Sequence, residues 1–361
     1  MTGDADARWM GEACAEARRG LGRTAPNPAV GCVIVKSGRL VGKGYHRRAG
    51  APHAEVEALA SAGRRAAGAT AYVTLEPCCH HGRTPPCTDA LVAAGVTAVV
   101  VGCKDPNPEV AGKGLRRLRQ AGLRAAVGVR KEECEDLIRG FRCWVTEARP
   151  WVHVKLAASL DARIAARGGA SKWISSPASR KLVQAMRARS DAILVGVGTV
   201  LADDPRLTCR QARSRNPLRV VLDSRLRTPA DARVVTGPGR CLLVCAKGAP
   251  AAARRRLEAA GAEVVEAAPH RRRGWQRLLA ELGRREVLEL LVEGGSEVAT
   301  AAITADVVNA MTIFYNPRLI GSDGVPLVGP LGVTTPQGAR RLRTVEWSAS
   351  GPDLVWTGVF E

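Results

Sequence analysis

The chain has 361 residues, which at about 150 residues per domain predicts two domains, each large enough to bury its own core. Its 54 Lys and Arg outnumber 34 Asp and Glu, and the resulting net charge of +20 would suit nucleic acid, an anionic membrane or anionic small molecules. The arginine runs at 254–256 and 271–273 lie in separate polar segments without interleaved aromatic residues. We therefore interpret the charge mainly as solvated surface rather than as a nucleic-acid site.

The sequence predicts neither a membrane span nor a secretory signal. The longest apolar candidate, 192–202, stops at Asp203 and Asp204, well short of the roughly 18 residues that a span requires. The N-terminus carries Asp4, Asp6 and Arg8 ahead of any apolar block, unlike a signal peptide. We expect a cytoplasmic protein in which the 11 cysteines are reduced, so that clustered cysteines indicate a metal or catalytic site before a disulfide.

The first half alternates β-rich runs with helical segments, which is typical of a layered α/β domain. We expect strands at 29–36, 71–75 and 97–101, and helices at 53–62, 88–94 and 113–121. A polar segment ending at Pro150 interrupts this pattern, so we place the domains at 1–147 and 148–361. For the second half we expect helices at 177–189 and 296–303, and strands at 151–157, 191–195, 218–222, 241–245, 287–292, 307–315 and 353–360.

Zinc-ligand residue types are concentrated in the first half. The triplet His53-Ala54-Glu55 begins a predicted helix, and alone it is more often a surface feature than a site. After the strand at 71–75, however, the turn-rich loop 76–87 holds three Cys and two His with little core to bury them. A catalytic zinc ion needs three protein ligands and one open position, and we expect His53, Cys78 and Cys87 to supply the three.

Glu55 is the candidate base of this site. Two thiolate ligands make a zinc-bound water less acidic than neutral ligands would, so a nearby base must help to remove its proton. Residues two apart in mid-helix diverge by about 200°. We therefore expect His53 at the helix entry, where both side chains can face one ion. Cys87, expected just before a helix, would have its thiolate favoured by the positive end of that helix.

His-Ala-Glu followed by Pro-Cys and a second Cys resembles the zinc nucleoside and nucleobase deaminases. Eight residues separate Cys78 from Cys87 instead of two, and the loop ending in Thr-Pro-Pro-Cys is similar to the bifunctional riboflavin-biosynthesis deaminase/reductases, as are segments 26–31, 44–46 and 105–108. The resemblance implies a substrate pocket formed by Asn27, His46, His80, Arg83 and Thr84. The family has Ser in place of Cys79, which we interpret as a tolerated replacement because a fourth ligand would close the zinc site.

The second half carries weaker signals of its own. Lys155 lies in a predicted strand, Trp173 follows Ser171 in a loop, and Glu293-Gly294-Gly295-Ser296 joins a strand to a helix. Such a glycine pair lets a pyrophosphate approach the amides of the helix, although Gly-Gly turns are common. No Gly-x-Gly-x-x-Gly follows an early strand, so an ordinary Rossmann site is not supported.

Segments 155–164, 171–174, 191–208, 218–224 and 293–295 resemble the reductase half of the same family, which implies a dihydrofolate-reductase-like fold and NADPH. By the family pattern the cofactor would contact Ala157, Trp173, Thr199, Asp203, Ser224, Gly295, Ser296, Glu297, Val298, Ala299, Thr300 and Ala301. The ribosyl phosphate substrate would contact Ser171, Arg187, Leu207, Arg210 and Glu293, with Lys155 as the catalytic group near the sugar. The family's Leu-Asp-Gly is Leu160-Asp161-Ala162 here, which costs about 1 kcal/mol if that residue has φ > 0.

The resemblance covers residues 9–360 and implies two domains and two reactions. We expect an N-terminal cytidine-deaminase-like three-layer α/β/α domain and a C-terminal dihydrofolate-reductase-like α/β domain. The first would use zinc to deaminate 2,5-diamino-6-(5-phosphoribosylamino)pyrimidin-4-one, with Glu55 moving the proton, and the second would use NADPH to reduce the ribosyl group to ribityl phosphate. The expected partner is this phosphorylated pyrimidine, with no specific nucleic acid and no membrane, and the chain is expected to form a homo-oligomer, a dimer or a tetramer.

Three alternative functions compete with this interpretation. A nucleic-acid-editing deaminase would suit the charge, but it predicts the short cysteine spacing and leaves the second half unexplained. A non-catalytic zinc-binding protein leaves Glu55 unexplained. A paralogue acting on a related amino-pyrimidine nucleotide in secondary metabolism is compatible with the sequence.

Overall fold

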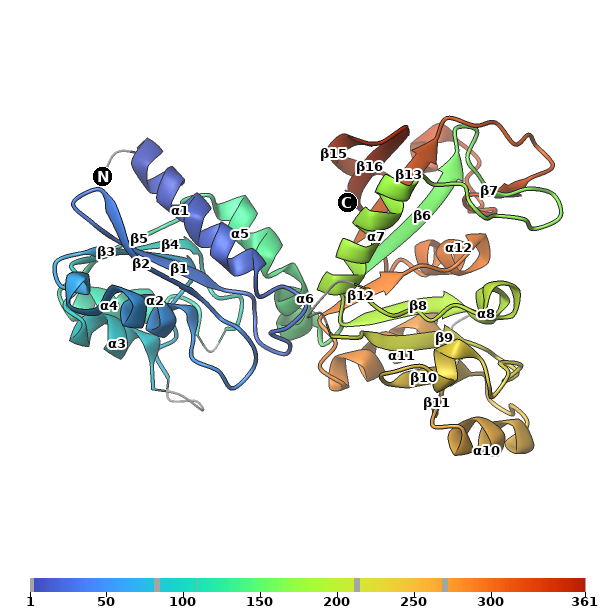
Figure 1. Ribbon diagram of the computed structural model, residues 1–361, viewed down its shortest axis with the longest axis horizontal. Helices are drawn as coiled ribbons and strands as arrows, with labels where there is room; N and C mark the ends of the chain where they lie inside the picture. The colour runs from blue at the N-terminus through green and yellow to red at the C-terminus, as the bar shows by residue number, and fades with distance from the viewer. Residues whose placement is uncertain (1–2, 81–84, 109, 211–214, 268–271, 361) are drawn as a thin grey trace. The chain divides into compact units, whose positions relative to one another are not determined.

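The computed structural model describes residues 3–80, 85–108, 110–210, 215–267 and 272–360. The contacts divide the chain into unit 1, Met1–Ala148, and unit 2, Arg149–Glu361 (Figure 1). Each unit has its own sheet and its own buried clusters, and each is described by itself below.

Unit 1 is built on a five-stranded sheet with the order β2-β1-β3-β4-β5. Its strands are β1 (Gly31–Lys36), β2 (Arg39–Tyr45), β3 (Thr70–Leu75), β4 (Ala98–Cys103) and β5 (Arg124–Val127). β1 pairs antiparallel with β2 and β3, whereas β3, β4 and β5 are parallel. The carboxyl ends of β3, β4 and β5 therefore lie at one edge of the sheet, the usual ligand-binding edge of an open α/β sheet.

Helices cover both faces of this sheet, which confirms the expected α/β/α layers (Figure 1). On one face α1 (Gly3–Arg18) and α5 (Lys131–Leu137) enclose a buried cluster. On the other, α2 (Ala54–Ala62), α3 (Cys87–Ala93) and α4 (Lys113–Gln120) enclose a second. The 3-10 helix η1 (Gly63–Ala66) follows α2, and α6 (Arg139–Glu147) ends near the division between the units.

Two glycines let α2 lie directly on β2. A Cβ at Gly42 would lie 2.4 Å from the carbonyl oxygen of Ala58, and a Cβ at Gly44 would lie 2.5 Å from the amide nitrogen of Ala58. Any side chain at these positions would push the helix away from the strand. This packing holds α2, which follows His53, in a fixed position on the sheet.

Unit 2 contains a nine-stranded sheet with the order β11-β10-β9-β8-β12-β6-β13-β16-β15. The strands are β6 (Trp151–Ser159), β8 (Ala192–Gly196), β9 (Leu218–Leu222), β10 (Cys241–Cys245), β11 (Glu263–Glu266), β12 (Glu289–Val292), β13 (Ala310–Asn316), β15 (Leu342–Ser350) and β16 (Asp353–Phe360). They are parallel from β11 to β13, and β16 and β15 complete the sheet in antiparallel pairing. A small second sheet joins β7 (Arg163–Ala165) to β14 (Val325–Pro326).

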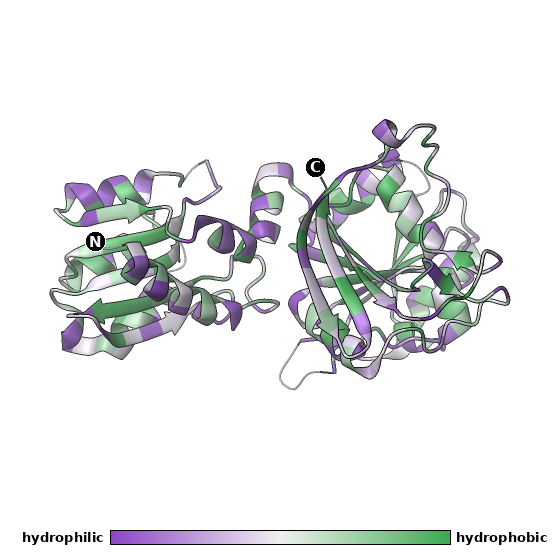
Figure 2. Ribbon diagram, turned by 90° about the horizontal axis from the view of Figure 1, so that it is seen from above, coloured by the Kyte–Doolittle hydropathy of each residue, from purple (hydrophilic) through white to green (hydrophobic). Residues whose placement is uncertain are grey.

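The large sheet is also covered on both faces. On one face, α11 (Arg272–Arg284) and α12 (Ser296–Thr304) pack on the cluster that includes the fully buried Trp275. On the other, α8 (Val197–Asp203), α9 (Arg233–Thr236) and α10 (Ala251–Ala259) enclose a second cluster, and α7 (Pro177–Arg189) packs on Phe314 and Val355. Figure 2 shows the hydrophobic residues gathered on the strands. The short 3-10 helix η2 (Pro336–Gly338) precedes β15.

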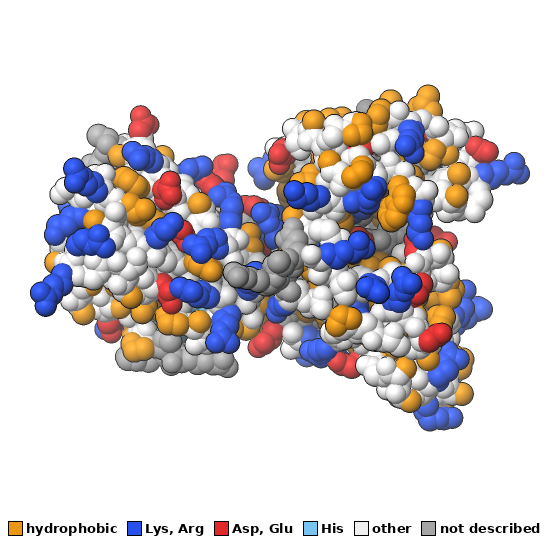
Figure 3. All heavy atoms as spheres, viewed as in Figure 1, with side chains coloured by type: hydrophobic (Ala, Val, Ile, Leu, Met, Phe, Trp, Pro, Cys, Tyr) orange, Lys and Arg blue, Asp and Glu red, His pale blue; other side chains and the backbone are white. Residues whose placement is uncertain are grey.

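The surface charge is dispersed. On the faces visible in Figure 3, Lys and Arg side chains are interspersed with polar, acidic and apolar ones. Arg254, Arg255 and Arg256 lie on α10, and Arg272 and Arg273 begin α11. Among the described residues, no helix combines the length and the apolar character needed to cross a membrane.

Candidate active sites

His53, Cys78 and Cys87 meet at the carboxyl edge of the unit 1 sheet. His53 is the N-cap of α2, Cys78 lies in the loop after β3, and Cys87 is the first residue of α3. The Nδ1 atom of His53 lies 3.2 Å from the Sγ of Cys87 and 3.6 Å from the Sγ of Cys78. All three ligand atoms lie within 4.8 Å of one another, so one ion can contact them together. The position of His53 at the helix entry agrees with the sequence analysis.

The thiols of Cys78 and Cys87 are coupled by a hydrogen bond. A hydrogen bond from the Cys87 thiol lowers the pKa of Cys78 to about 4, and the same bond, together with burial, raises the pKa of Cys87 far above its usual range. The backbone N–H of Cys87 also donates to the Sγ of Cys78 at 3.4 Å. The expectation that the helix favours a Cys87 thiolate concerns the zinc-bound site and stays a prediction.

The donor set fits zinc. One imidazole nitrogen and two sulfurs are the ligands of a catalytic zinc site, and a divalent cation between the sulfurs would stabilise a second thiolate. Cys79 is half-buried and does not belong to the group of close ligand atoms found among the described residues. The set of three thus leaves a coordination position for water.

Glu55 lies in the first turn of α2 and is only 3% exposed. Burial raises its pKa to about 7, and the negative charge of Cys78 acts in the same direction. A carboxyl group with a pKa near neutrality can take up and release a proton in one reaction cycle. Its carboxyl group interacts with His53, Cys78 and Cys87, so it lies beside the metal-ligand group.

Asn27 and His46 adjoin the same group. The amide Nδ2 of Asn27 lies 3.0 Å from the Nε2 of His46, and the Nδ1 of His46 lies 3.1 Å from the carbonyl oxygen of Pro52. These contacts assign the tautomer in which Nδ1–H donates to Pro52 and Nε2 accepts from Asn27. Burial lowers the pKa of His46, and its ring centroid lies 5.3 Å from that of His53. His46 is therefore a neutral polar group next to the ligands.

The other expected substrate residues of unit 1 lie in the loop between the two cysteines. His80 is exposed. Arg83 and Thr84 lie outside the described residues.

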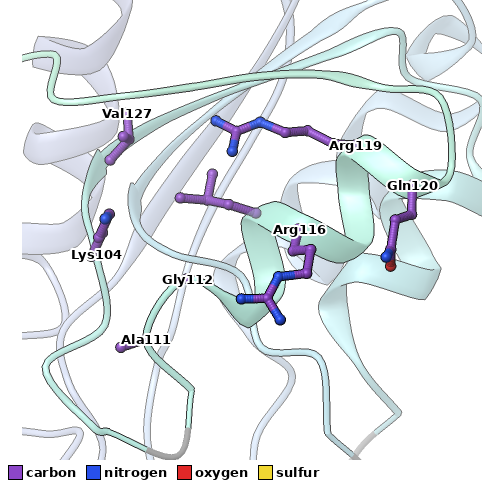
Figure 4. A pocket seen from close by; sticks show the side chains of 8 residues that line it. Lys104, Ala111, Gly112, Arg116, Arg119, Gln120 and Val127 are labelled. Atoms are coloured by element: carbon purple, nitrogen blue, oxygen red, sulfur yellow. The ribbon is translucent and has the colours of Figure 1, made fainter.

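A basic cavity of about 650 Å³ opens at the carboxyl ends of β4 and β5 (Figure 4). It is lined by Lys104, Ala111, Gly112, Leu115, Arg116, Arg119, Gln120 and Val127. The guanidinium group of Arg119 is held by the carbonyl oxygen of Ala125, at 2.9 Å from Nη2. The metal-ligand residues do not line this cavity, which is therefore a separate feature of the same sheet edge.

In unit 2, Lys155, Arg187 and Glu293 form a half-buried charged cluster. Nε and Nη2 of Arg187 donate to the two carboxylate oxygens of Glu293 at 2.6 and 2.9 Å, and Nη1 reaches the carbonyl oxygen of Thr208 at 3.4 Å. Although burial opposes it, Arg187 holds the pKa of Glu293 below its usual range. Burial lowers the pKa of Lys155, against the attraction of Glu293. Most of the donors of Arg187 are thus already engaged.

The remaining substrate candidates of unit 2 are Leu207, Ser171 and Arg210. Leu207 is buried with φ +50°, and Ser171 is half-buried. Arg210 is exposed, and its backbone N–H donates to Oε1 of Gln184 at 3.0 Å, which ties its segment to α7.

The turn between β12 and α12 has the form of a phosphate cradle. A Cβ at Gly294 would lie 2.6 Å from the Cβ of Val298, so only glycine lets the turn fold onto the helix. Gly295 is the N-cap of α12 and has no side-chain capping bond, and a Cβ there would meet only the Cδ1 of Ile164, at 3.9 Å. The first amides of α12 are therefore accessible to an anion.

The other cofactor candidates occupy several elements. Ser224 follows β9, Thr199 and Asp203 lie on α8, Ala157 lies on β6, and Ser296, Glu297, Val298 and Ala301 lie on α12. Ala299 is fully buried, and the hydroxyl of Thr300 is bonded to the carbonyl oxygen of Ser296 at 2.6 Å. Of the candidate cofactor residues 295–301, Gly295 and the exposed or half-buried residues of α12 are therefore the ones accessible to a ligand.

Trp173 is 64% exposed, with the guanidinium group of Arg180 4.7 Å from its ring centroid. Nζ of Lys172 pairs with Asp203 at 2.8 Å, which joins the tryptophan loop to α8. The sequence analysis did not single out Arg180 or Lys172. Lys172 adjoins Trp173 in the sequence, whereas Arg180 lies on α7 and no sequence signal linked it to that loop.

Comparison with known proteins assigns both halves. Residues 4–103 match the family model for the cytidine and deoxycytidylate deaminase zinc-binding region, and residues 150–356 match the RibD C-terminal domain. The chain is 43% identical to the riboflavin biosynthesis protein RibD of Escherichia coli, covering 97% of this chain and 98% of that protein. It is 40% identical to the protein of the same name from Aquifex aeolicus, covering 98% of each.

Solved structures agree over the whole length. The RibD structure of Acinetobacter baumannii, form 1, has a TM-score of 0.90 at 37% identity and full coverage of both chains. A diaminohydroxyphosphoribosylaminopyrimidine deaminase/5-amino-6-(5-phosphoribosylamino)uracil reductase from Thermotoga maritima has a TM-score of 0.89 at 35% identity, covering 99% of each chain. These likenesses extend over the same span as the resemblance found in the sequence.

Proposed function

Because the chain belongs to the RibD family of riboflavin-biosynthesis deaminase/reductases, we propose that unit 1 is its zinc-dependent deaminase domain and unit 2 its NADPH-dependent reductase domain. The observation that carries the first assignment is the convergence of His53, Cys78 and Cys87 beside the buried Glu55. The second is supported by the charged cluster around Lys155 and by the open glycine turn before α12.

The proposed substrate of unit 1 is 2,5-diamino-6-(5-phosphoribosylamino)pyrimidin-4-one, which loses its amine to give the corresponding uracil. A zinc ion held by His53, Cys78 and Cys87 would supply the Lewis acidity that makes a water nucleophilic. Glu55 takes the proton of this water and passes it to the departing ammonia, as its raised pKa permits. Asn27, oriented by its contact with the neutral His46, binds the pyrimidine through its amide group, and His46 lies beside it in the pocket.

In unit 2, NADPH would supply the hydride that reduces C1′ of the opened ribosyl group. Gly295 and the first amides of α12 hold its pyrophosphate, and the exposed Trp173 offers a stacking surface. Lys155, held next to Glu293, is the candidate donor of the proton that accompanies the hydride. Arg210 holds the phosphate at the far end of the substrate, which aligns C1′ with the cofactor.

Zinc analysis and one matched pair of variants test the deaminase site. We expect about one zinc per chain by elemental analysis, and we expect Cys78→Ser to lose the metal and ammonia release because a hydroxyl is a poor zinc ligand. Cys79→Ser is the control, and it should keep both. An active wild-type chain without zinc, or zinc loss in Cys79→Ser, would refute the ligand assignment.

Turnover of the riboflavin precursor separates the proposed substrate from a related amino-pyrimidine nucleotide. Ammonia release from the precursor at a rate far above that from other amino-pyrimidine nucleotides is the expected result. A cytoplasmic location and a dimer or tetramer remain predictions, and sedimentation of the purified chain tests the second.

A further inference from the structure

Glu76 is a buried acid in unit 1 for which the deamination chemistry has no use. It follows β3 directly and precedes Pro77 and Cys78, and it is only 3% exposed. Its backbone N–H donates to the carbonyl oxygen of Cys103 at 3.0 Å, which extends the pairing of β3 with β4. A carboxylate buried this deeply needs several hydrogen bonds to offset its lost hydration.

Those bonds come from the backbone at the start of α4 and from the loop after β4. Oε2 of Glu76 accepts from the N–H of Gly112 at 2.9 Å and from that of Asp105 at 3.3 Å. Oε1 accepts from the N–H of Leu115 at 3.1 Å. Gly112 is the N-cap of α4 and has no side chain to cap the helix, so Glu76 performs this role from a distant part of the chain.

The backbone beside Glu76 is pressed against the same helix turn. A Cβ at Gly114 would lie 2.1 Å from the carbonyl oxygen of Pro77, so only glycine allows this contact. Gly112 also lines the basic cavity at this edge (Figure 4), so the junction of the Glu76–Pro77 segment with the first turn of α4 borders that cavity.

Cys78 is fixed on its other side by α3. Its carbonyl oxygen accepts from the N–H of Thr88 at 3.2 Å, and its Sγ accepts from the N–H of Cys87 at 3.4 Å. The short segment from Glu76 to Cys78 is therefore held between the first turns of two helices. The Glu76 carboxylate provides the anchor on the α4 side.

We propose that Glu76 is a positioning residue of the deaminase site, whose carboxylate anchors the segment bearing Cys78 to α4 and so keeps its sulfur in place beside His53 and Cys87. This proposal rests on the proposed zinc-dependent function of unit 1. Glu76 acts through Cys78 and contacts neither the metal nor the substrate.

The test is the zinc affinity of Glu76→Gln in the full chain, measured by competition with a chelator. Glutamine has the same shape, but its NH₂ group would face at least one of the three backbone N–H donors. We expect zinc affinity to fall about 10- to 100-fold, the usual effect of losing a group that orients a metal ligand. Deamination should recover at saturating zinc, and reduction in unit 2 should be unchanged.

Tyr72→Phe is the matched control. Tyr72 lies on β3, the strand that Glu76 follows. Its hydroxyl donates to Oδ1 of Asp6 at 2.8 Å, away from the loop that bears Cys78. This variant loses one buried hydrogen bond of unit 1, and it should keep wild-type zinc affinity. A similar loss of affinity in both variants would reduce the role of Glu76 to general stability and overturn the proposal.

Gly114→Ala tests the same junction from the helix side and should also weaken zinc binding. Unchanged affinity in a folded Glu76→Gln variant overturns the proposal and leaves the deaminase function intact, whereas a wild-type chain that binds no zinc overturns both. If neither junction variant folds, the role is structural and the proposal is rejected.

Discussion

Ala162 adopts φ +59°, so the condition under which alanine is costly in place of the family's glycine is met. It lies in the turn between β6 and β7, where its N–H donates to the carbonyl oxygen of Ser159 at 3.0 Å. A non-glycine residue in this region costs about 1–2 kcal/mol, so the turn is strained at its Cβ.

Ala162→Gly should therefore stabilise unit 2, by about 0.5–1 kcal/mol after the greater flexibility of glycine in the unfolded chain is counted. Denaturant unfolding of the full chain measures the change. The control is Ala166→Gly, at a nearby position without positive φ, which should lower stability. No gain from Ala162→Gly would mean that the packing of the Ala162 methyl group on the core outweighs the strain.

Site residues whose types and spacing are typical of metal ligands were predictable from the sequence. Buried polar residues whose hydrogen-bond partners are backbone groups elsewhere in the chain were not. His53, Cys78 and Cys87 stand out because zinc selects few ligand types. Arg219 shows the opposite case: it lies in β9 with no exposed surface, and its Nη2 donates to the carbonyl oxygens of Gly237 and Gly239 at 2.9 and 2.6 Å. Nothing in the strand pattern indicates that those carbonyl groups will enclose a guanidinium group.

At the level of elements, Asp353 fixes the start of α7 to the antiparallel part of the unit 2 sheet. Its Oδ2 accepts from the backbone N–H of Ser176 at 2.8 Å and from the hydroxyl of Ser179 at 2.5 Å, and its Oδ1 accepts from Nδ2 of Asn316 at 2.7 Å. Arg187 lies near the other end of α7. The network therefore sets the position of α7, whose Arg187 donates hydrogen bonds to Glu293.

Asp353→Asn should destabilise unit 2 by about 1–3 kcal/mol, since it removes a charged acceptor from a buried network. Burial raises the pKa of Asp353, but hydrogen bonds from Ser179, Ser176 and Asn316 outweigh it and hold that pKa below its usual range. The carboxylate thus adds stability above the unfolded pKa of about 4, and this stability is lost as the pH falls through the lower folded value.

Unfolding free energies measured at pH 7 and near pH 3 test both statements. The difference between wild type and Asp353→Asn should shrink at the lower pH. Ser179→Ala, which removes a single donor, should cost less than Asp353→Asn at pH 7. A pH-independent difference would show that the charge of Asp353 contributes nothing.

Strands rich in β-branched and other apolar residues, and helices with a clear N-terminal signal, were predictable. β9, β10, β16 and α7 have the predicted bounds. β2 was missed because Gly42 and Gly44 weaken a strand pattern, although the packing of α2 requires them. α11 was missed because its charged start masks the buried face formed by Trp275, Leu278 and Leu282. In each case a tertiary contact overrode the local pattern.

For the whole molecule, the two-unit organisation makes the proposed reactions separable. Glu55 and the metal-ligand group lie in unit 1, and Lys155, Glu293 and Arg210 lie in unit 2. Glu55 therefore has no assigned role in the reduction, and Lys155 has none in the deamination.

Glu55→Gln should keep zinc and the fold, lose most ammonia release and leave NADPH-dependent reduction of the supplied deaminated intermediate nearly intact, because it removes a proton carrier and not a ligand. Arg210→Ala should show the reverse pattern, with kcat/KM for reduction lowered roughly ten- to a hundredfold because a charged phosphate contact of about 1.5–3 kcal/mol is lost. Both half-reactions are measured for each variant. If a folded Glu55→Gln chain failed to reduce the supplied intermediate, the two sites would have to share a step, and the assignment of one reaction to each unit would be rejected.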